Sequence, residues 1–165
     1  YWRWAADDAY LPAGGFLSTA DDMAIYARAM LAGSPGFLAK AREPIAAIDA
    51  TTSQLASLGI RMDSAGAAWM IDEEHGIVWH NGGTSNFSCY MGLDPARQIA
   101  VVILTNLAPD YRIPATVLGA KLLQELQATV ALLRLRRARW RIHAPALRLR
   151  VPSKARQSAV AQFVR

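Results

Sequence analysis

The sequence predicts an α+β fold in which an antiparallel sheet is flanked by helices. Apolar segments at residues 77–80, 87–93 and 99–104 are separated by short turn-forming stretches, which is typical of neighbouring antiparallel strands. Apolar residues recur at helical spacing in residues 18–33 and again over about residues 113–130. With 165 residues and 53% hydrophobic content, the chain is one domain or a piece of one, and it can bury a core.

The first helix has clear start and stop signals. Residues 10–16 are predicted to be a loop, because they contain a proline and two glycines. The helix then begins after Ser18 or Thr19, whose hydroxyl can accept a hydrogen bond from an exposed N–H group of the first turn. Two aspartates follow, where they suit the positive end of the helix dipole. Gly33 provides the stop.

The stretch after this helix is less regular. Residues 37–48 form a weaker helical pattern, with a break expected at Glu43 because Pro44 follows it. The next residues have no clear period. Residues 67–80 then have the pattern of a β-hairpin, with its turn at residues 73–76.

The second half of the chain completes the predicted sheet. A tight turn at Gly82 and Gly83 is expected to lead into the strand at residues 87–93. The strand at residues 99–104 is apolar on both faces, which predicts a central strand that is covered on each side. A helix over about residues 113–130 follows.

Charge is divided unevenly along the chain. Residues 1–125 carry 8 Lys/Arg and all 13 Asp/Glu, a net charge of −5, whereas residues 126–165 carry 10 Lys/Arg and no acid, a net charge of +10. We therefore predict two parts. Residues 1–125 belong to a folded domain, and residues 126–165 hold the end of the last helix and a basic, partly disordered or out-of-frame tail.

Two segments carry a resemblance to a known family. One is PAGGFLSTADDM at residues 12–23, and the other runs from WHNGGT at residues 79–84 to LTN at residues 104–106. In this order and spacing they resemble the penicillin-recognising serine hydrolases, which include class C β-lactamases, D-alanyl-D-alanine carboxypeptidases, penicillin-binding proteins and related esterases. The resemblance implies a β-lactamase/transpeptidase-like fold, with residues 1–125 as the C-terminal portion of the domain.

The resemblance also implies parts that this sequence does not contain. In the family the nucleophile is the Ser of a Ser-x-x-Lys motif, and a Tyr-x-Asn loop supplies acid–base groups. Neither pattern occurs among the 165 residues. We therefore expect an incomplete domain from a truncated or frameshifted bacterial hydrolase, inactive alone and prone to self-association through an exposed apolar sheet face. The parent enzyme would need no cofactor, and its substrate would be a β-lactam, a D-Ala-D-Ala peptide or a small ester.

The resemblance assigns roles to consecutive residues of the second motif. His80 takes the catalytic place of the family's basic third-motif residue, where it would favour developing negative charge. Asn81 and Thr84 fall at substrate-binding positions, and Gly82 lets the strand pass close to the ligand. The N–H group of Gly83 would be one of two oxyanion-hole donors, which contributes about 3 kcal/mol to the transition state.

Two residues depart from the family pattern. His80 stands where efficient β-lactamases have Lys. Because imidazole holds a substrate carboxylate less firmly than an ammonium group, esterase or peptidase relatives are the closer analogy. Asn86 precedes Phe87 where the family usually has Gly, and Asn tolerates the left-handed region that such a turn can require.

Several residues have plainer interpretations. An alternative for His80 is a hydrogen-bonded histidine at a strand end with no chemistry. His75 is expected to be a solvated turn residue, and Cys89 is expected to be a buried, inert thiol. The spacing of these three residues matches no zinc motif, so we predict no metal site.

The basic tail leaves three interpretations open. Its arginines could bind nucleic-acid phosphates or an anionic membrane surface, it could be a solvated extension, or it could come from a shifted reading frame. Nucleic acid is the least favoured partner, because no nucleic-acid-binding fold accompanies the arginines. A non-catalytic ligand-binding module is the alternative function for the domain. The resemblance implies a periplasmic or secreted protein, although no signal-peptide pattern is present.

Overall fold

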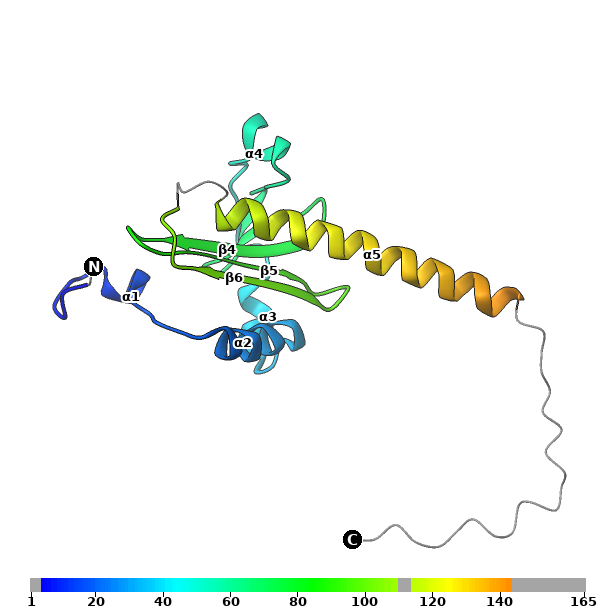
Figure 1. Ribbon diagram of the computed structural model, residues 1–165, viewed down its shortest axis with the longest axis horizontal. Coiled ribbons are helices and arrows are strands. Elements are labelled where there is room, and N and C mark those ends of the chain that lie inside the picture. Colours follow the sequence, from blue (N-terminus) through cyan, green and yellow to red (C-terminus); the bar gives the residue numbers. More distant parts are fainter. Residues whose placement is uncertain (1–3, 110–113, 144–165) are drawn as a thin grey trace, which may run out of the picture. The chain divides into compact units, whose positions relative to one another are not determined.

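The structure, a computed structural model, describes residues 4–109 and 114–143, with side chains of the last helix as far as residue 137. The chain divides into two compact units, Tyr1–Ala131 and Leu132–Arg165. The sheet, the shorter helices and the N-terminal part of the last helix belong to the first unit (Figure 1). The α+β class that the sequence predicts is confirmed, with an antiparallel sheet flanked by helices.

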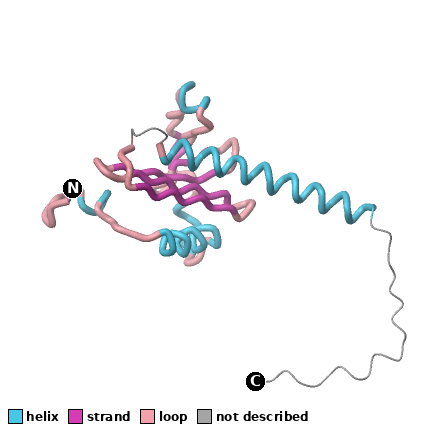
Figure 2. The backbone as a smooth tube through the Cα atoms, viewed as in Figure 1, coloured by secondary structure: helices cyan, strands magenta, loops and turns pink. Residues whose placement is uncertain are grey.

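Six antiparallel strands form one sheet, and each strand pairs with its neighbour in sequence (Figure 2). In order they are β1 (Ala46–Ala47), β2 (Ser64–Ala65), β3 (Met70–Asp72), β4 (Ile77–Gly83), β5 (Ser88–Asp94) and β6 (Ile99–Thr105). The register of the longest pairs places His80 opposite Met91 and Gly83 opposite Ser88. The predicted strands of the second half are therefore present, with β4 longer than expected.

Helices cover both faces of the sheet. The described helices are α1 (Leu11–Gly14), α2 (Ala20–Ala32), α3 (Gly36–Ala41), α4 (Ser53–Ser57) and α5 (Ala115–His143). The helices α2 and α3 lie on one face, and the N-terminal part of α5 lies on the other (Figure 1).

The start and end of α2 follow the predicted signals. The Thr19 hydroxyl accepts a hydrogen bond from the Asp22 N–H at 3.2 Å, which satisfies one exposed donor of the first turn. Gly33 ends the helix with φ of 65°, a left-handed conformation that costs glycine little. The cap and the stop fix where the buried side of α2 meets the sheet.

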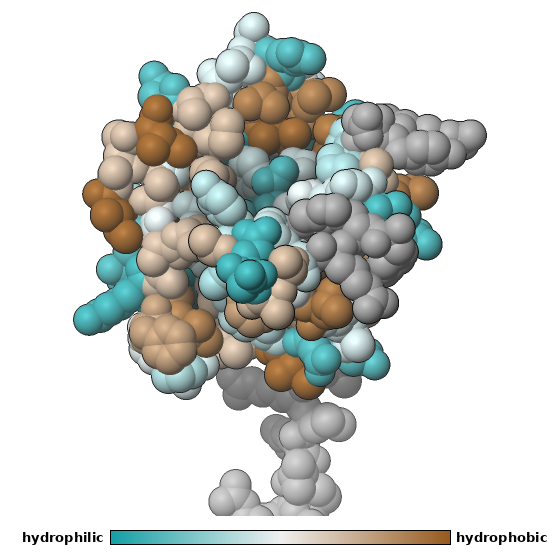
Figure 3. Space-filling view, turned by 90° about the vertical axis from the view of Figure 1, so that its left-hand side faces the viewer, coloured by the Kyte–Doolittle hydropathy of each residue, from teal (hydrophilic) through white to brown (hydrophobic). Residues whose placement is uncertain are grey.

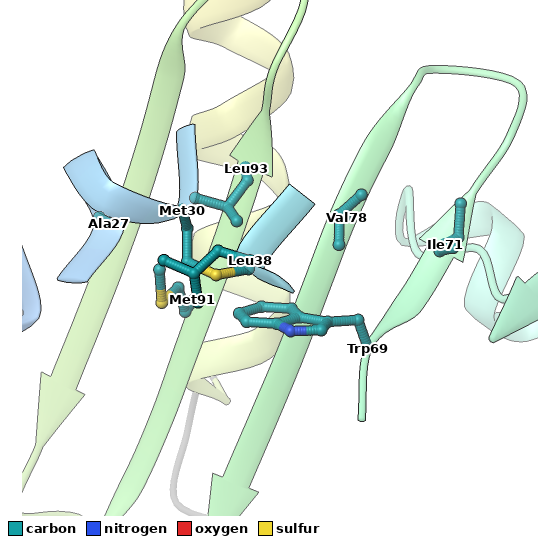
Figure 4. Packing of buried hydrophobic residues seen from close by; sticks show 8 residues of the cluster. All are labelled: Ala27, Met30, Leu38, Trp69, Ile71, Val78, Met91 and Leu93. Carbon is teal, nitrogen blue, oxygen red and sulfur yellow. The ribbon is translucent and has the colours of Figure 1, made fainter. Parts of the chain in front are cut away.

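The first core cluster lies between the sheet and the helices α2 and α3. Its buried members are Ala27, Met30, Leu38, Trp69, Ile71, Val78, Met91 and Leu93. Met30 of α2 and Leu93 of β5 are both 0% exposed, so water does not reach either side chain in this cluster. The indole of Trp69 extends toward the same group from the start of β3 (Figure 4).

The second core cluster lies between the sheet and α5. Its buried members are Ile60, Ile77, Trp79, Tyr90, Val101, Ala115, Ala120 and Leu123. The rings of Trp79 and Tyr90 stack with centroids 6.0 Å apart, and Trp79 Nε1 donates to the Arg61 carbonyl at 2.8 Å. Burial raises the pKa of the Tyr90 hydroxyl, with a smaller contribution from the Asp72 carboxylate.

A buried polar network ties α5 to two turns of the sheet. Asp94 is 0% exposed and accepts from the Arg97 N–H at 2.9 Å, from Arg97 Nη1 at 2.8 Å and from Gln127 Nε2 at 2.6 Å. Gln127 also donates to the His75 carbonyl at 3.1 Å. Burial alone would raise the pKa of Asp94, but the hydrogen bonds from Gln127 and Arg97 outweigh it and lower that pKa.

Three predicted features differ, two near residues 79–87 and one at the N-terminal end. The predicted loop at residues 10–16 contains the one-turn helix α1, because Pro12 fits the first turn of a helix. Gly82 and Gly83 do not form a turn: β4 continues through both, and the chain turns at residues 84–87. Asn86 does not adopt the left-handed conformation.

Other predicted boundaries shift because tertiary pairing decides them. The helix expected at residues 37–48 ends at Ala41, and residues 46–47 form β1 instead. The strand β6 is the last strand of the described sheet rather than a central one. It is apolar on both faces because helices cover both. The helix α5 ends at His143, well beyond residue 130. The tail at residues 144–165 lies outside the described residues.

Most exposed apolar side chains lie on helices and loops rather than on a bare sheet face. Phe16 and Leu17, between α1 and α2, are 87% and 94% exposed. The space-filling view likewise shows several separate hydrophobic groups among hydrophilic ones (Figure 3). Helices pack on both faces, and β1 and β6 are the outer strands of the described sheet. Self-association itself stays a prediction.

Candidate functional site

The second half of β4 has no strand partner on the β3 side among the described residues. Met70 of β3 pairs with Trp79, and β3 contributes no partner beyond that point. The strand β4 nevertheless continues to Gly83, with β5 as its neighbour. Residues 80–83 therefore have one paired side and one side that β3 has left.

The hairpin register sets where the backbone donors of this stretch point. The Thr84 N–H donates to the Phe87 carbonyl at 2.8 Å, which makes these two residues a hydrogen-bonded pair. Hydrogen-bonded and non-hydrogen-bonded pairs alternate along an antiparallel ladder. Gly82 is therefore bonded to β5, whereas the N–H groups of Asn81 and Gly83 point to the side that β3 has left. Two backbone donors line one open edge.

His80 lies beside this edge with its ring exposed. Its ring makes a T-shaped contact with Trp69, with centroids 6.5 Å apart and an interplanar angle of 83°. Trp69 is buried in the core on the side of α2 and α3. Because alternate residues of a strand face opposite sides, His80 projects on that same side, next to Val78 and Met91 of the core.

Asn81 projects on the opposite face, toward α5. Its Nδ2 donates to the Thr116 hydroxyl at 2.9 Å, in the first turn of that helix. The structure thus brings His80 and the Gly83 backbone to one edge, but it separates the side chain of Asn81 from the imidazole. The assigned substrate-binding role of Asn81 stays a prediction.

Close packing accounts for both glycines. Neither Gly82 nor Gly83 has a positive φ, so their role is space rather than an unusual backbone. A Cβ at Gly83 would collide with Pro109, and a Cβ at Gly82 would lie 3.1 Å from the Cys89 sulfur. Thr84 follows directly and closes the hairpin through its backbone. Pro109 therefore packs against the strand at Gly83, on the side of α5. Cys89 of the neighbouring strand β5 packs against it at Gly82.

The remaining candidates lie apart from the edge or are unreactive. Cys89 is partly buried, and burial raises the pKa of its thiol, with a smaller opposing effect of the Gly82 N–H. His75 lies in the turn before β4, at the other end of the strand. Its Nδ1 is 2.8 Å from Asp72 Oδ2, so it is partnered rather than simply solvated. Within residues 4–109 and 114–137, no three His, Cys, Asp or Glu side chains gather as metal ligands.

Three residues that contact residues 80–83 could not be identified from the sequence. Trp69, Pro109 and Thr116 contact the motif from 11 to 35 positions away in sequence, and no local pattern connects them to it. The assembled edge can present the Gly83 N–H group, with the imidazole of His80 close by, to an oxygen that carries or develops negative charge.

One comparison with known proteins gives a match. The family model described as Beta-lactamase matches residues 1–124. No curated protein matches the sequence. In the part of the chain that the structure describes, no helix is both long enough and apolar enough to cross a lipid bilayer.

Proposed function

Because this chain belongs to the β-lactamase family, we propose that residues 80–83 form one wall of the acyl-transfer site of a serine hydrolase. The observation that carries the proposal is the end of β3 opposite Trp79, which leaves the N–H groups of Asn81 and Gly83 pointing to an open edge. Of these, the Gly83 N–H would be one donor to a tetrahedral oxyanion, and the N–H of the nucleophilic serine would be the second. His80 stands next to them on the exposed side.

In the proposed reaction, a serine attacks the carbonyl carbon of an amide or ester. The Gly83 N–H donates to the oxyanion that forms, and such a donor contributes about 3 kcal/mol to the transition state. Collapse of the intermediate expels the amine or alcohol and leaves an acyl-serine ester, which water then hydrolyses. His80 is placed to favour the negative charge of the intermediate or of a substrate carboxylate.

The nucleophile has to come from a segment other than these residues. The 165 residues contain no Ser that is followed three positions later by Lys. We place the serine, its lysine and the Tyr-x-Asn loop on a further segment of a longer polypeptide. The 165-residue chain by itself is therefore expected not to form an acyl-enzyme, since the oxyanion donors alone give only a small remainder of catalysis.

The preferred substrates are a small ester or a D-Ala-D-Ala peptide, ahead of a β-lactam. The reason is the imidazole of His80 at the basic position of the motif. Imidazole is a weaker base than a lysine amine and holds a carboxylate less firmly. The assignment to esterase or peptidase relatives, and to bacteria, rests on the family pattern of the motifs.

Covalent labelling tests the proposal. A fluorophosphonate probe and a fluorescent penicillin should leave the 165-residue chain unlabelled. Either probe should label the same chain when it is joined to the upstream-encoded segment that carries Ser-x-x-Lys. Labelling of the chain alone would contradict the proposal, and so would the lack of any upstream Ser-x-x-Lys segment.

Two substitutions test whether His80 belongs to the proposed acyl-transfer site. In the joined protein, His80→Ala should slow acylation by about a hundredfold, in the range that loss of one transition-state donor produces. Asn86→Ala, an exposed polar residue in the turn of the same hairpin, is the matched control and should leave the rate within about twofold. Equal effects of the two substitutions would remove His80 from the site.

A second candidate function is a ligand-binding module without chemistry. The absence of Ser-x-x-Lys from the sequence favours it. It predicts saturable binding of an acyl-D-Ala carboxylate by the 165-residue chain, lost in His80→Ala and without a covalent adduct. No binding at millimolar ligand would leave the hydrolase proposal as the one to pursue.

A further inference from the structure

The C-terminal part of α5 combines positive charge with exposed leucines. Residues 126–165 carry 10 Lys/Arg and no Asp or Glu. Within the described part of this stretch, residues 132–137 read Leu-Leu-Arg-Leu-Arg-Arg and are helical and exposed. We call these six residues the Leu-Arg segment. The positive charge of this segment favours a negatively charged partner.

The leucines of the Leu-Arg segment are the unusual part. Leu132, Leu133 and Leu135 are 60%, 53% and 63% exposed. Single exposed leucines are ordinary on a protein surface. Three within two turns, in a segment whose other residues are all arginines, leave a sizeable apolar area in water, without a described neighbour that covers it.

Helix geometry separates the two residue types only in part. At about 100° per residue, Leu132 and Leu135 lie about 60° apart on one side of the helix. Arg134 and Arg137 lie about 60° apart on the other side. Arg136 lies about 40° from Leu132, and Leu133 lies about 40° from Arg137. Each exposed leucine of the segment therefore has arginine side chains close by.

Of the anionic partners, a lipid surface uses both residue types. A nucleic acid would neutralise the arginines and leave the leucines in water. A second copy of this segment would bring like charges together. At a bilayer surface, leucines can enter the headgroup–acyl boundary while arginine side chains reach the phosphate groups.

We propose that the Leu-Arg segment binds the surface of a bilayer that contains anionic phospholipid, with the helix lying in the plane of the interface. The charge supplies the attraction at a distance, and burial of the leucines supplies the contact. This activity goes beyond the proposed acyl transfer and does not depend on it, because it needs no nucleophile and no residue of β4.

Vesicle co-sedimentation of the full chain tests the proposal. Vesicles of phosphatidylcholine alone are compared with vesicles that contain about 30 mol% phosphatidylglycerol, in about 0.1 M salt, where surface charge is still felt. The chain should bind the anionic vesicles at least about tenfold more tightly than the neutral ones. Equal partition onto both kinds of vesicle would overturn the proposal.

Two triple variants separate charge from apolar contact. Arg134→Gln/Arg136→Gln/Arg137→Gln should lower the partition coefficient by about a hundredfold, since each arginine near an anionic surface contributes about fivefold. Leu132→Gln/Leu133→Gln/Leu135→Gln should lower it by at least about tenfold. Glutamine is used in both because its helix propensity is close to that of leucine and arginine. Circular dichroism checks that α5 persists.

A matched charge control completes the design. Arg28→Gln/Lys40→Gln/Lys121→Gln removes three exposed cations from the first unit and lowers the net charge of +5 by the same three charges. It should bind anionic vesicles like the parent chain. Loss equal to that of the arginine triple would overturn the proposal in favour of bulk charge. Unchanged vesicle binding by the leucine triple, together with retardation of a DNA duplex, would overturn it in favour of nucleic acid.

Discussion

Replacing Asp94 by Asn should destabilise the fold by about 3 kcal/mol at neutral pH. Asp94 Oδ2 accepts from Arg97 Nη1 at 2.8 Å and from Gln127 Nε2 at 2.6 Å. An amide NH2 group in that place would face two donors. Gln127 is only 9% exposed, so its amide cannot hydrogen-bond to water instead. Losing the Gln127–Asp94 hydrogen bond should therefore cost about as much as losing a buried bond to a charged group, about 1.5–3 kcal/mol. The Arg97 side chain is 37% exposed and can hydrogen-bond to water instead, so losing the Arg97–Asp94 ion pair should cost about 1 kcal/mol.

The pH dependence of this difference identifies its origin. Because the folded-state pKa of Asp94 is lowered, the unfolded chain binds its proton more readily than the folded chain. The stability from the ionised carboxylate is therefore fully present above the unfolded pKa of about 3.9 and is lost as the pH falls through the lower folded pKa. The gap between the parent chain and Asp94→Asn should be widest near neutrality and should narrow below about pH 4.

Urea unfolding followed by tryptophan fluorescence measures the effect. With a slope of about 2 kcal/mol per molar urea, the midpoint of Asp94→Asn should fall by about 1.5 M at neutral pH. Asp7→Asn, an exposed carboxylate, is the control and should change stability by less than about 0.5 kcal/mol. The reasoning is refuted if Asp94→Asn is as stable as the control at neutral pH. A gap that is constant down to pH 3 would also refute the role of the charge.

Three further predictions concern the site wall and its support. Gly83→Ala should cost about 1–3 kcal/mol, because the new methyl group collides with Pro109, whereas Gly36→Ala meets no atom within 4 Å and should be neutral or slightly stabilising. Thermal melts of the pair check this, and equal melting temperatures would contradict it. Leu123→Ala, at a side chain that is 0% exposed, should cost about 2–5 kcal/mol in urea titrations, and a loss under about 1 kcal/mol would mean that α5 does not seal the second core. Cys89 should react with iodoacetamide more slowly in the folded chain than in urea near pH 8, because burial raises its pKa, and equal rates would contradict that burial.

The sequence was sufficient where an element carries its own period or cap. The alternation and turn residues of residues 77–104 predicted the order of β4, β5 and β6, and Thr19 with Gly33 predicted both ends of α2. The strands β1 and β2 have two residues each, too short for any period to appear, and only pairing with β3 creates them. The glycines of the motif suggested a turn, but the packing of Pro109 and Cys89 explains them inside a strand.

The candidate site likewise has one part that the sequence predicts and another that only tertiary packing creates. The motif pointed to His80 and to the Gly83 N–H, and strand geometry alone places them at one edge. The partner of Asn81 is Thr116, 35 positions away, and the ring beside His80 is that of Trp69. These contacts form only when α5 and the segment around β3 pack against the rest of the sheet. No sequence pattern near Asn81 predicts them.

The sequential order of the strands also bears on how the chain acquires its structure. Every strand pairs with the one before or after it, so no sheet pairing has to wait for a distant part of the chain. Sheets built from such local pairings have low contact order and fold fast for a β-structure. During synthesis, the sheet could assemble hairpin by hairpin as it leaves the ribosome, before α5 arrives to cover its second face. We therefore expect the slow step to be the docking of α5, when Gln127 reaches Asp94.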